Sequence, residues 1–123
     1  MKLFLTTLLL AITLSSTAFG DDFRDGLEAA SKGDSKTAMK LWRPMAEQGY
    51  AGAQYALGVM YDNGEGVPED KVLAYMWWNL AAANGIEDAS TNKGIIAKRM
   101  TSSQIAEAQK LSRECLRKNY KNC

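Results

Sequence analysis

The chain of 123 residues is close to neutral, with 15 Lys and Arg against 14 Asp and Glu and a formal net charge of +1. It contains no histidine and only two cysteines, so the composition gives no support to histidine-based metal centres or to catalysis by a histidine general base. The balanced charge gives no reason to expect a nucleic-acid partner, and we expect neither a metal nor a cofactor.

The start of the chain predicts an export signal outside the fold. Lys2 precedes an apolar run over residues 3–14, and small residues ending at Gly20 follow it, as a signal peptidase requires. The run is shorter than the roughly 20 residues that span a bilayer. We therefore expect a signal peptide over residues 1–20, cleaved after Gly20. The mature chain, residues 21–123, is predicted to be periplasmic or secreted, with no stable membrane anchor.

Helical patterns begin directly after this segment, and the mature chain shows no strand pattern. Residues 23–31 predict a first helix. Asp34 is expected to cap a second helix that ends before Gly49. A third helix is expected over residues 51–63, where Gly58 would let a neighbouring element approach closely.

A turn rich in glycine, with one proline, is predicted over residues 64–69, after which Asp70 is expected to cap the next helix. That helix is expected to end before Gly85 and to bury Trp77. A weaker helical pattern follows. Thr101 and Gln104 then predict a capping box that opens the final helix. Its inward residues are expected to be Ile105, Ala108, Leu111 and Leu116.

Tryptophan and glycine recur at a spacing of 36 residues, since Trp42 and Gly49 return as Trp78 and Gly85. A period in this range marks stacked supersecondary units, each of which buries its apolar face against a neighbour. The sequence therefore predicts an all-α fold: a short α-solenoid of antiparallel helix pairs, closed by a C-terminal capping helix.

Residues 53–70, which read AQYALGVMYDNGEGVPED, make the repeat more specific. With the alanine, tryptophan and glycine that follow, this stretch resembles the SEL-1-like repeat, a relative of the tetratricopeptide repeat. The resemblance covers a partial repeat at residues 23–52, a full repeat at 53–89, and a degenerate third unit with the capping helix at 90–123. It implies a right-handed stack whose first helices line a concave face for protein or peptide recognition, without catalysis.

The resemblance also implies a binding site. The concave positions of the related repeat, carried onto two helices one period apart, are Tyr55, Val59, Asp62, Asn63, Thr91, Ile95, Lys98 and Arg99. Acidic and basic residues would then flank Tyr55 and Val59, as suits a peptide with an apolar anchor and flanking charges. We expect a protein or peptide partner in the cell envelope. The small number of repeats leaves an oligomer open.

Both cysteines, Cys115 and Cys123, lie in the last nine residues. In an exported protein such a pair indicates a disulfide first, and a bridge would require the chain to turn back near Asn119. Whether the bridge is intramolecular stays open. Some cysteine-containing members of the resembled family have been linked to β-lactam binding or hydrolysis, so an enzyme of that type is the alternative to a non-catalytic adaptor.

Charge is divided along the mature chain. Residues 21–90 carry twelve acids and six bases, whereas residues 91–123 carry two acids and eight bases. A basic tail is compatible with anionic lipid or nucleic acid, but cations near the end of a helix also complement the helix dipole. We favour this second interpretation of the tail.

Overall fold

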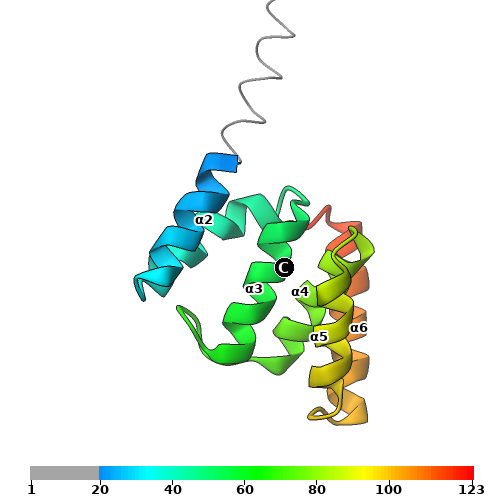
Figure 1. The fold of residues 1–123 in the computed structure, drawn as a ribbon. Coiled ribbons are helices and arrows are strands. Elements are labelled where there is room, and N and C mark those ends of the chain that lie inside the picture. The colour runs from blue at the N-terminus through cyan, green and yellow to red at the C-terminus, as the bar shows by residue number, and fades with distance from the viewer. Residues whose placement is uncertain (1–19) are drawn as a thin grey trace, which may run out of the picture.

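The computed structural model describes residues 20–123, and within this range the chain forms helices and turns with no strand. A helical segment over residues 20–31 comes first. The following helices are α2 (Ser35–Ala46), α3 (Ala51–Asn63), α4 (Lys71–Ala83), α5 (Glu87–Ala97) and α6 (Ser102–Arg117). They succeed one another from one end of the molecule to the other (Figure 1). The predicted all-α solenoid is confirmed, whereas the predicted signal peptide falls on residues 1–19, outside this range, apart from Gly20.

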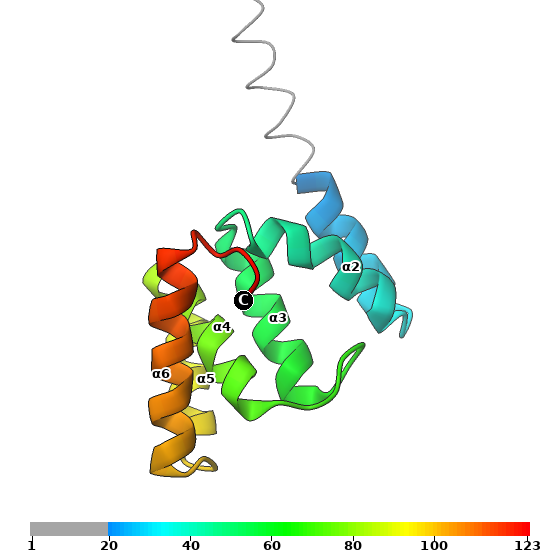
Figure 2. The same cartoon turned by 180° about the vertical axis from the view of Figure 1, so that it is seen from behind.

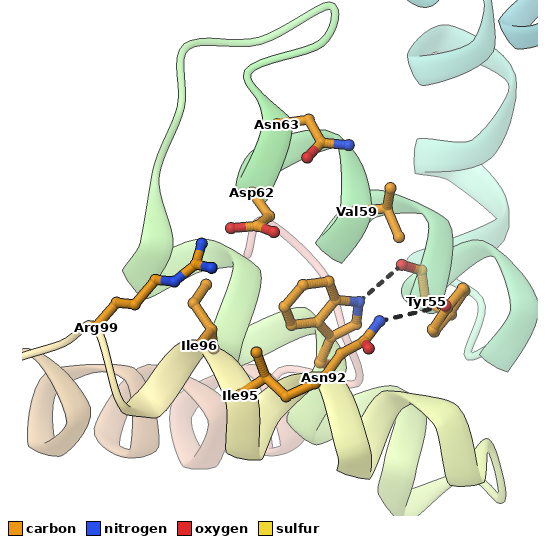
Figure 3. A pocket seen from close by; sticks show the side chains of 9 residues that line it. Tyr55, Val59, Asp62, Asn63, Asn92, Ile95, Ile96 and Arg99 are labelled. Atoms are coloured by element: carbon orange, nitrogen blue, oxygen red, sulfur yellow. Dashed lines mark hydrogen bonds between the residues drawn. The ribbon is translucent and has the colours of Figure 1, made fainter.

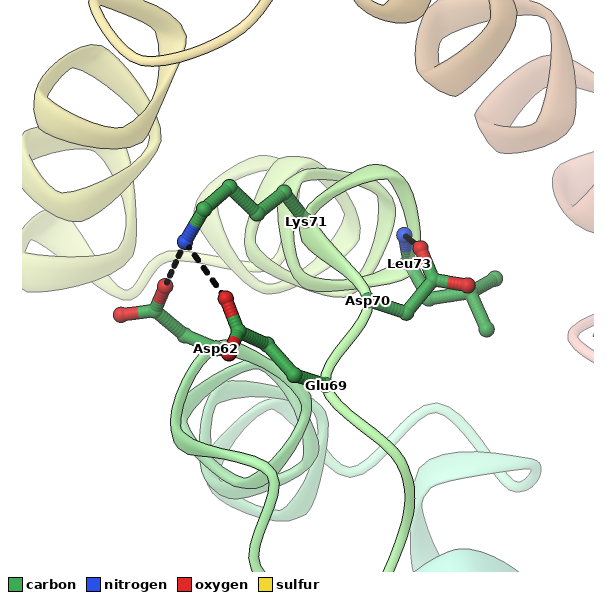
Figure 4. Close-up of polar contacts among 5 residues, drawn as sticks. All are labelled: Asp62, Glu69, Asp70, Lys71 and Leu73. Carbon is green, nitrogen blue, oxygen red and sulfur yellow. Dashed lines mark hydrogen bonds and ion pairs between the residues drawn. The ribbon is translucent and has the colours of Figure 1, made fainter.

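Three helices begin at the caps that the sequence predicts. Asp34 caps α2, and the Asp70 carboxylate accepts a hydrogen bond of 3.0 Å from the Leu73 N–H at the start of α4 (Figure 4). At α6, Thr101 and Gln104 form both bonds of the capping box, at 3.1 and 2.9 Å. These side chains satisfy N–H groups that a helix start leaves without partners, so the helix boundaries are encoded locally.

Glycine and tryptophan interdigitate in the first two helix pairs. A Cβ atom on Gly58 in α3 would overlap the indole of Trp78 in α4, and one on Gly26 would overlap the indole of Trp42. Each indole also donates a hydrogen bond of 3.2 Å to a backbone carbonyl of the helix it covers. The glycine thus opens a space that the tryptophan of the same pair fills, and this confirms the close approach expected at Gly58.

The last two helices, α5 and α6, lack the contact between glycine and tryptophan that joins the first two helix pairs. Both α5 and α6 pack against α4. Gly94 lies one period after Gly58, yet a Cβ atom there would meet nothing within 4 Å. Trp42 and Trp78 each lie eight residues after the N-cap of their helix. Gln109 lies at the same distance from Thr101, the N-cap of α6. The third unit therefore lacks the interdigitated pair.

The C-terminal tail folds back over the earlier helices (Figure 2). Cys115 and Cys123 form an intramolecular disulfide, with Cα atoms 5.5 Å apart, and Asn119 has a positive φ where the chain reverses. Both the predicted bridge and the predicted reversal are confirmed. Beyond the reversal, the Lys121 ammonium donates a hydrogen bond of 3.0 Å to the Glu47 carbonyl at the end of α2.

A buried amide joins the first unit to the second. Gln54 in α3 is fully buried and donates a hydrogen bond of 3.1 Å to the Ala46 carbonyl. Its own oxygen accepts a bond of 2.9 Å from Asn84 at the end of α4. The Tyr120 hydroxyl lies 3.2 Å from the same Asn84 amide, so the tail adds to this joint.

One predicted core position is wrong. Trp77 is fully buried, as expected, but Leu116 in α6 is 47% exposed. The residues of α6 that are buried against α4 are Ala108, Ser112 and Cys115. Because successive helical residues are about 100° apart, a stripe through Cys115 turns Leu116 away from the core.

The described residues contain no helix that is both long enough and apolar enough to cross a membrane.

Candidate functional site

A cavity of about 300 Å³ opens between α3 and α5 (Figure 3), and Trp78 of α4 also lines it. Six of the eight predicted binding residues line it: Tyr55, Val59, Asp62, Asn63, Ile95 and Arg99. Ile95 is 51% exposed, which is unusual for a large apolar side chain in this protein. The residues predicted from two separate repeats are thus brought together around one opening.

Thr91 and Lys98, the other two predicted residues, are exposed but do not line the cavity. Asn92 and Ile96 take part instead, from positions one residue later and two residues earlier in α5. The repeat spacing placed α5 correctly along the chain. Asn92 and Ile96 lie 36 residues after Ala56 and Met60 of α3, so the two missed residues also follow the repeat period. The sequence signal that could have found them is this period, applied to the face of α3 that turns toward the preceding helical segment.

A second cavity, also of about 300 Å³, lies between the helical segment over residues 20–31 and α3. Its walls are mainly apolar and include Leu27, which is 49% exposed. Tyr55 and Val59 line this cavity as well as the first. We call the two cavities together the inner groove. The other residues that line the second cavity are Phe23, Ala30, Trp42, Gly52, Ala56, Met60 and Glu65.

Tyr55 is held in place at the junction of the two cavities. Its hydroxyl accepts a hydrogen bond of 3.2 Å from the Asn92 amide, and its carbonyl accepts the 3.2 Å bond from the Trp78 indole (Figure 3). A tyrosine whose hydroxyl and backbone carbonyl are both hydrogen-bonded loses little further freedom when a ligand packs against its ring. The groove therefore has a preorganised centre.

Of the two charged side chains that line the first cavity, only the acidic one has an ionic partner among the described residues. Lys71 lies 3.5 Å from Asp62 and 3.1 Å from Glu69, so the Asp62 carboxylate is already paired (Figure 4). Hydrogen bonding to Glu69 is the main cause that raises the pKa of Lys71 above its ordinary value. Arg99, by contrast, forms no ion pair within residues 20–123. The cationic side of the predicted rim is the side left free for a ligand.

No cluster of three or more histidine, cysteine or acidic side chains in the described part of the chain could hold a metal ion. Both cysteines are in the disulfide, so neither supplies a thiol nucleophile.

Comparison with known proteins agrees with the helix pairs. The family described as Sel1 repeat matches residues 23–50 and 51–86, which is more than half of the chain. The chain belongs to the Sel1 repeat family. Its predicted resemblance is confirmed, and the Sel1 repeat is a scaffold typical of protein–protein interaction.

Two curated relatives are similar to about two thirds of this chain, and each is named "Exopolysaccharide production negative regulator". The protein from Rhizobium leguminosarum bv. viciae is 32% identical over 82 residues, covering 67% of this chain and 31% of its own length. That from Rhizobium meliloti (strain 1021) is 31% identical over 80 residues, covering 65% of this chain and 30% of its own. This chain spans less than a third of either relative.

A solved Sel1-type structure shows the same arrangement. The crystal structure of c5321, a protective antigen of uropathogenic Escherichia coli strains with an SLR fold, matches with a TM-score of 0.71 and 30% identity. The match covers 80% of this chain and 23% of the larger protein. The short solenoid described above therefore corresponds to part of a longer chain with an SLR fold.

Proposed function

We propose that this protein is an exported adaptor that binds a protein or peptide segment in its inner groove, without catalysing a reaction. One observation carries the proposal: Tyr55 and Val59 lie in both cavities, so apolar contacts from two repeat units form one continuous surface. A groove of this kind suits a segment that lays several side chains along it.

The chemistry of the groove supports a definite type of ligand segment. Leu27 and Ile95, at its two ends, are both about half exposed and can each pack against an apolar side chain. Arg99 offers a free guanidinium beside Ile95, which suits a carboxylate near one end of the segment. We therefore expect apolar anchors with an acidic residue at the α5 end.

The proposal gives the protein a role of the same type as its relatives' names indicate. A regulator of exopolysaccharide production acts on other components, and binding another protein is one way to do so. The alternative of a β-lactam enzyme has no comparable support, since Cys115 of α6 and Cys123 of the tail are paired and lie outside the inner groove.

Photo-crosslinking in cells tests the groove. The photoreactive residue p-benzoylphenylalanine would be placed at Ile95 or, as a matched control, at Leu116, which is equally exposed and apolar but lies on α6 away from the groove. We expect a discrete crosslinked product from position 95 only. Equal products from both positions would reject the groove as the binding site.

Export of the protein can be tested separately from binding in the groove. If residues 1–20 are a cleaved signal, the protein recovered from the cell envelope or the medium begins at Asp21, which mass spectrometry detects directly. An intact N-terminus on protein recovered from the cytoplasm would contradict export and leave the groove experiment unaffected.

A further inference from the structure

A third cavity, of about 440 Å³, lies along α2, separate from the inner groove. Lys36, Lys40 and Arg43 line it at spacings that bring them onto one face of α2. Met39 and Pro44 supply apolar surface beside them. We call this surface the α2 groove. None of its lining residues belongs to the inner groove.

The three cations of the α2 groove are exceptional for their part of the chain. Residues 21–90 contain twelve acids and only six bases. The other three bases, Arg24, Lys32 and Lys71, are each paired with a carboxylate. Within residues 20–123, the three cations of the α2 groove form no ion pair, although carboxylates outnumber them. Half of the bases of an acidic region thus gather, unpaired, at one cavity.

One of these cations is held in a fixed position. The Arg43 guanidinium donates a hydrogen bond of 2.6 Å to the Tyr61 hydroxyl and lies 6.0 Å from the centre of the Tyr61 ring. This contact uses part of the guanidinium and leaves further N–H groups for a ligand, since arginine has five donors. The cation is therefore preorganised toward an anion.

The length of the cationic stripe limits its ligand. Seven residues of helix separate Lys36 from Arg43, a rise of about 10 Å. Carboxylates bound the stripe at both ends, because Asp34 caps the start of α2 and Glu47 lines the far end of the cavity. A long polyanion such as a nucleic acid would continue onto these negative ends and be repelled there. A short acidic segment would fit between them.

From this arrangement we propose that the α2 groove is a second binding site, specific for a short acidic peptide segment of a partner protein. The two or three carboxylates of this peptide segment pair with Lys36, Lys40 and Arg43. The methylene groups of the same acidic side chains pack on Met39 and Pro44. The site is independent of the inner groove, so an adaptor with both sites can hold two segments at once.

Fluorescence anisotropy with a labelled hexaglutamate peptide tests the proposal on the mature chain. We expect saturable binding that weakens as salt rises from about 0.05 M to about 0.3 M, because screening shortens the reach of the exposed charges. The double variant Lys36→Glu/Lys40→Glu should bind at least about tenfold more weakly, because attraction becomes repulsion at two of three contacts. A neutral version, Lys36→Gln/Lys40→Gln, should lose about threefold or more, because two attractive contacts are absent.

The matched control is Lys110→Glu/Arg113→Glu on α6, which changes the net charge by the same amount at exposed residues outside the α2 groove. It should keep wild-type affinity within about twofold, because distant exposed charges are screened. Circular dichroism would establish that each variant folds. An equal loss in both charge-reversed variants, no saturable binding, or equally tight binding of a single-stranded oligonucleotide would each overturn the proposal.

Discussion

The first two helix pairs and the last two helices solve the same packing problem in different ways. In the first two pairs an indole covers a glycine and donates to the backbone beside it, at Gly26 and Trp42 and again at Gly58 and Trp78. In the third unit the corresponding glycine, Gly94, is open to solvent. There the disulfide and the tail hold the end of the chain instead.

This difference shows what a repeat position requires. A glycine in a helix costs stability unless the space above it is used, because it adds backbone entropy without burying a side chain. Contact with the Trp78 ring offsets this loss of stability at Gly58, whereas no side chain of the described residues covers Gly94. The same residue one period apart is therefore structural in one unit and dispensable in the next.

The largest expected effect comes from removing a tryptophan of a complete pair. Trp78→Ala should destabilise the protein by about 3–5 kcal/mol, because it leaves a large cavity over Gly58. Gln109→Ala, at the corresponding place in the third unit, should cost less than about 0.5 kcal/mol, because that side chain is exposed. Urea unfolding of both variants measures the contrast. Similar losses would show that the third unit is packed like the others.

Substituting the glycines should give effects of opposite sign. Gly58→Ala should cost about 3 kcal/mol, because its methyl group would overlap the buried Trp78 ring. Gly94→Ala should stabilise the protein by about 0.5–1 kcal/mol, since the space is open and alanine favours helix. Thermal and urea unfolding would report both values. A stabilising Gly58→Ala would contradict the interdigitated packing.

Removing the disulfide tests how the third unit is held. Cys115→Ser/Cys123→Ser should lose about 2 kcal/mol, because the bridge closes a short loop and restricts the unfolded chain only modestly. Hydrogen exchange should become faster at the end of α2, which Lys121 of the tail contacts. Lys118→Ser, exposed within the same loop, is the control and should leave both readings unchanged. Unchanged exchange at α2 in the double variant would show that the tail docks without its bridge.

Much of the candidate site was predictable because six of its residues occupy repeat positions. Tyr55 and Val59 follow from the pattern of α3, and Ile95 follows one period later. Asn92 was missed, because it lies one period after Ala56, which was not among the concave positions carried over from the related repeat. The α2 groove was missed too, since Lys36 and Lys40 look like ordinary exposed residues until their lack of acidic partners is seen in three dimensions.

The sequence by itself determined the helices, their caps, the repeat period and the cysteine pair, because these depend on residues close together in the chain. Asp70 caps α4 through a bond to Leu73, three residues away, and Gly85 takes a positive φ where that helix ends. Only the tertiary structure decided that Asn92 bonds to Tyr55, why Leu116 turns outward, and which cations remain unpaired. These outcomes depend on side chains from distant segments competing for the same space and the same charges, and no local pattern records that competition.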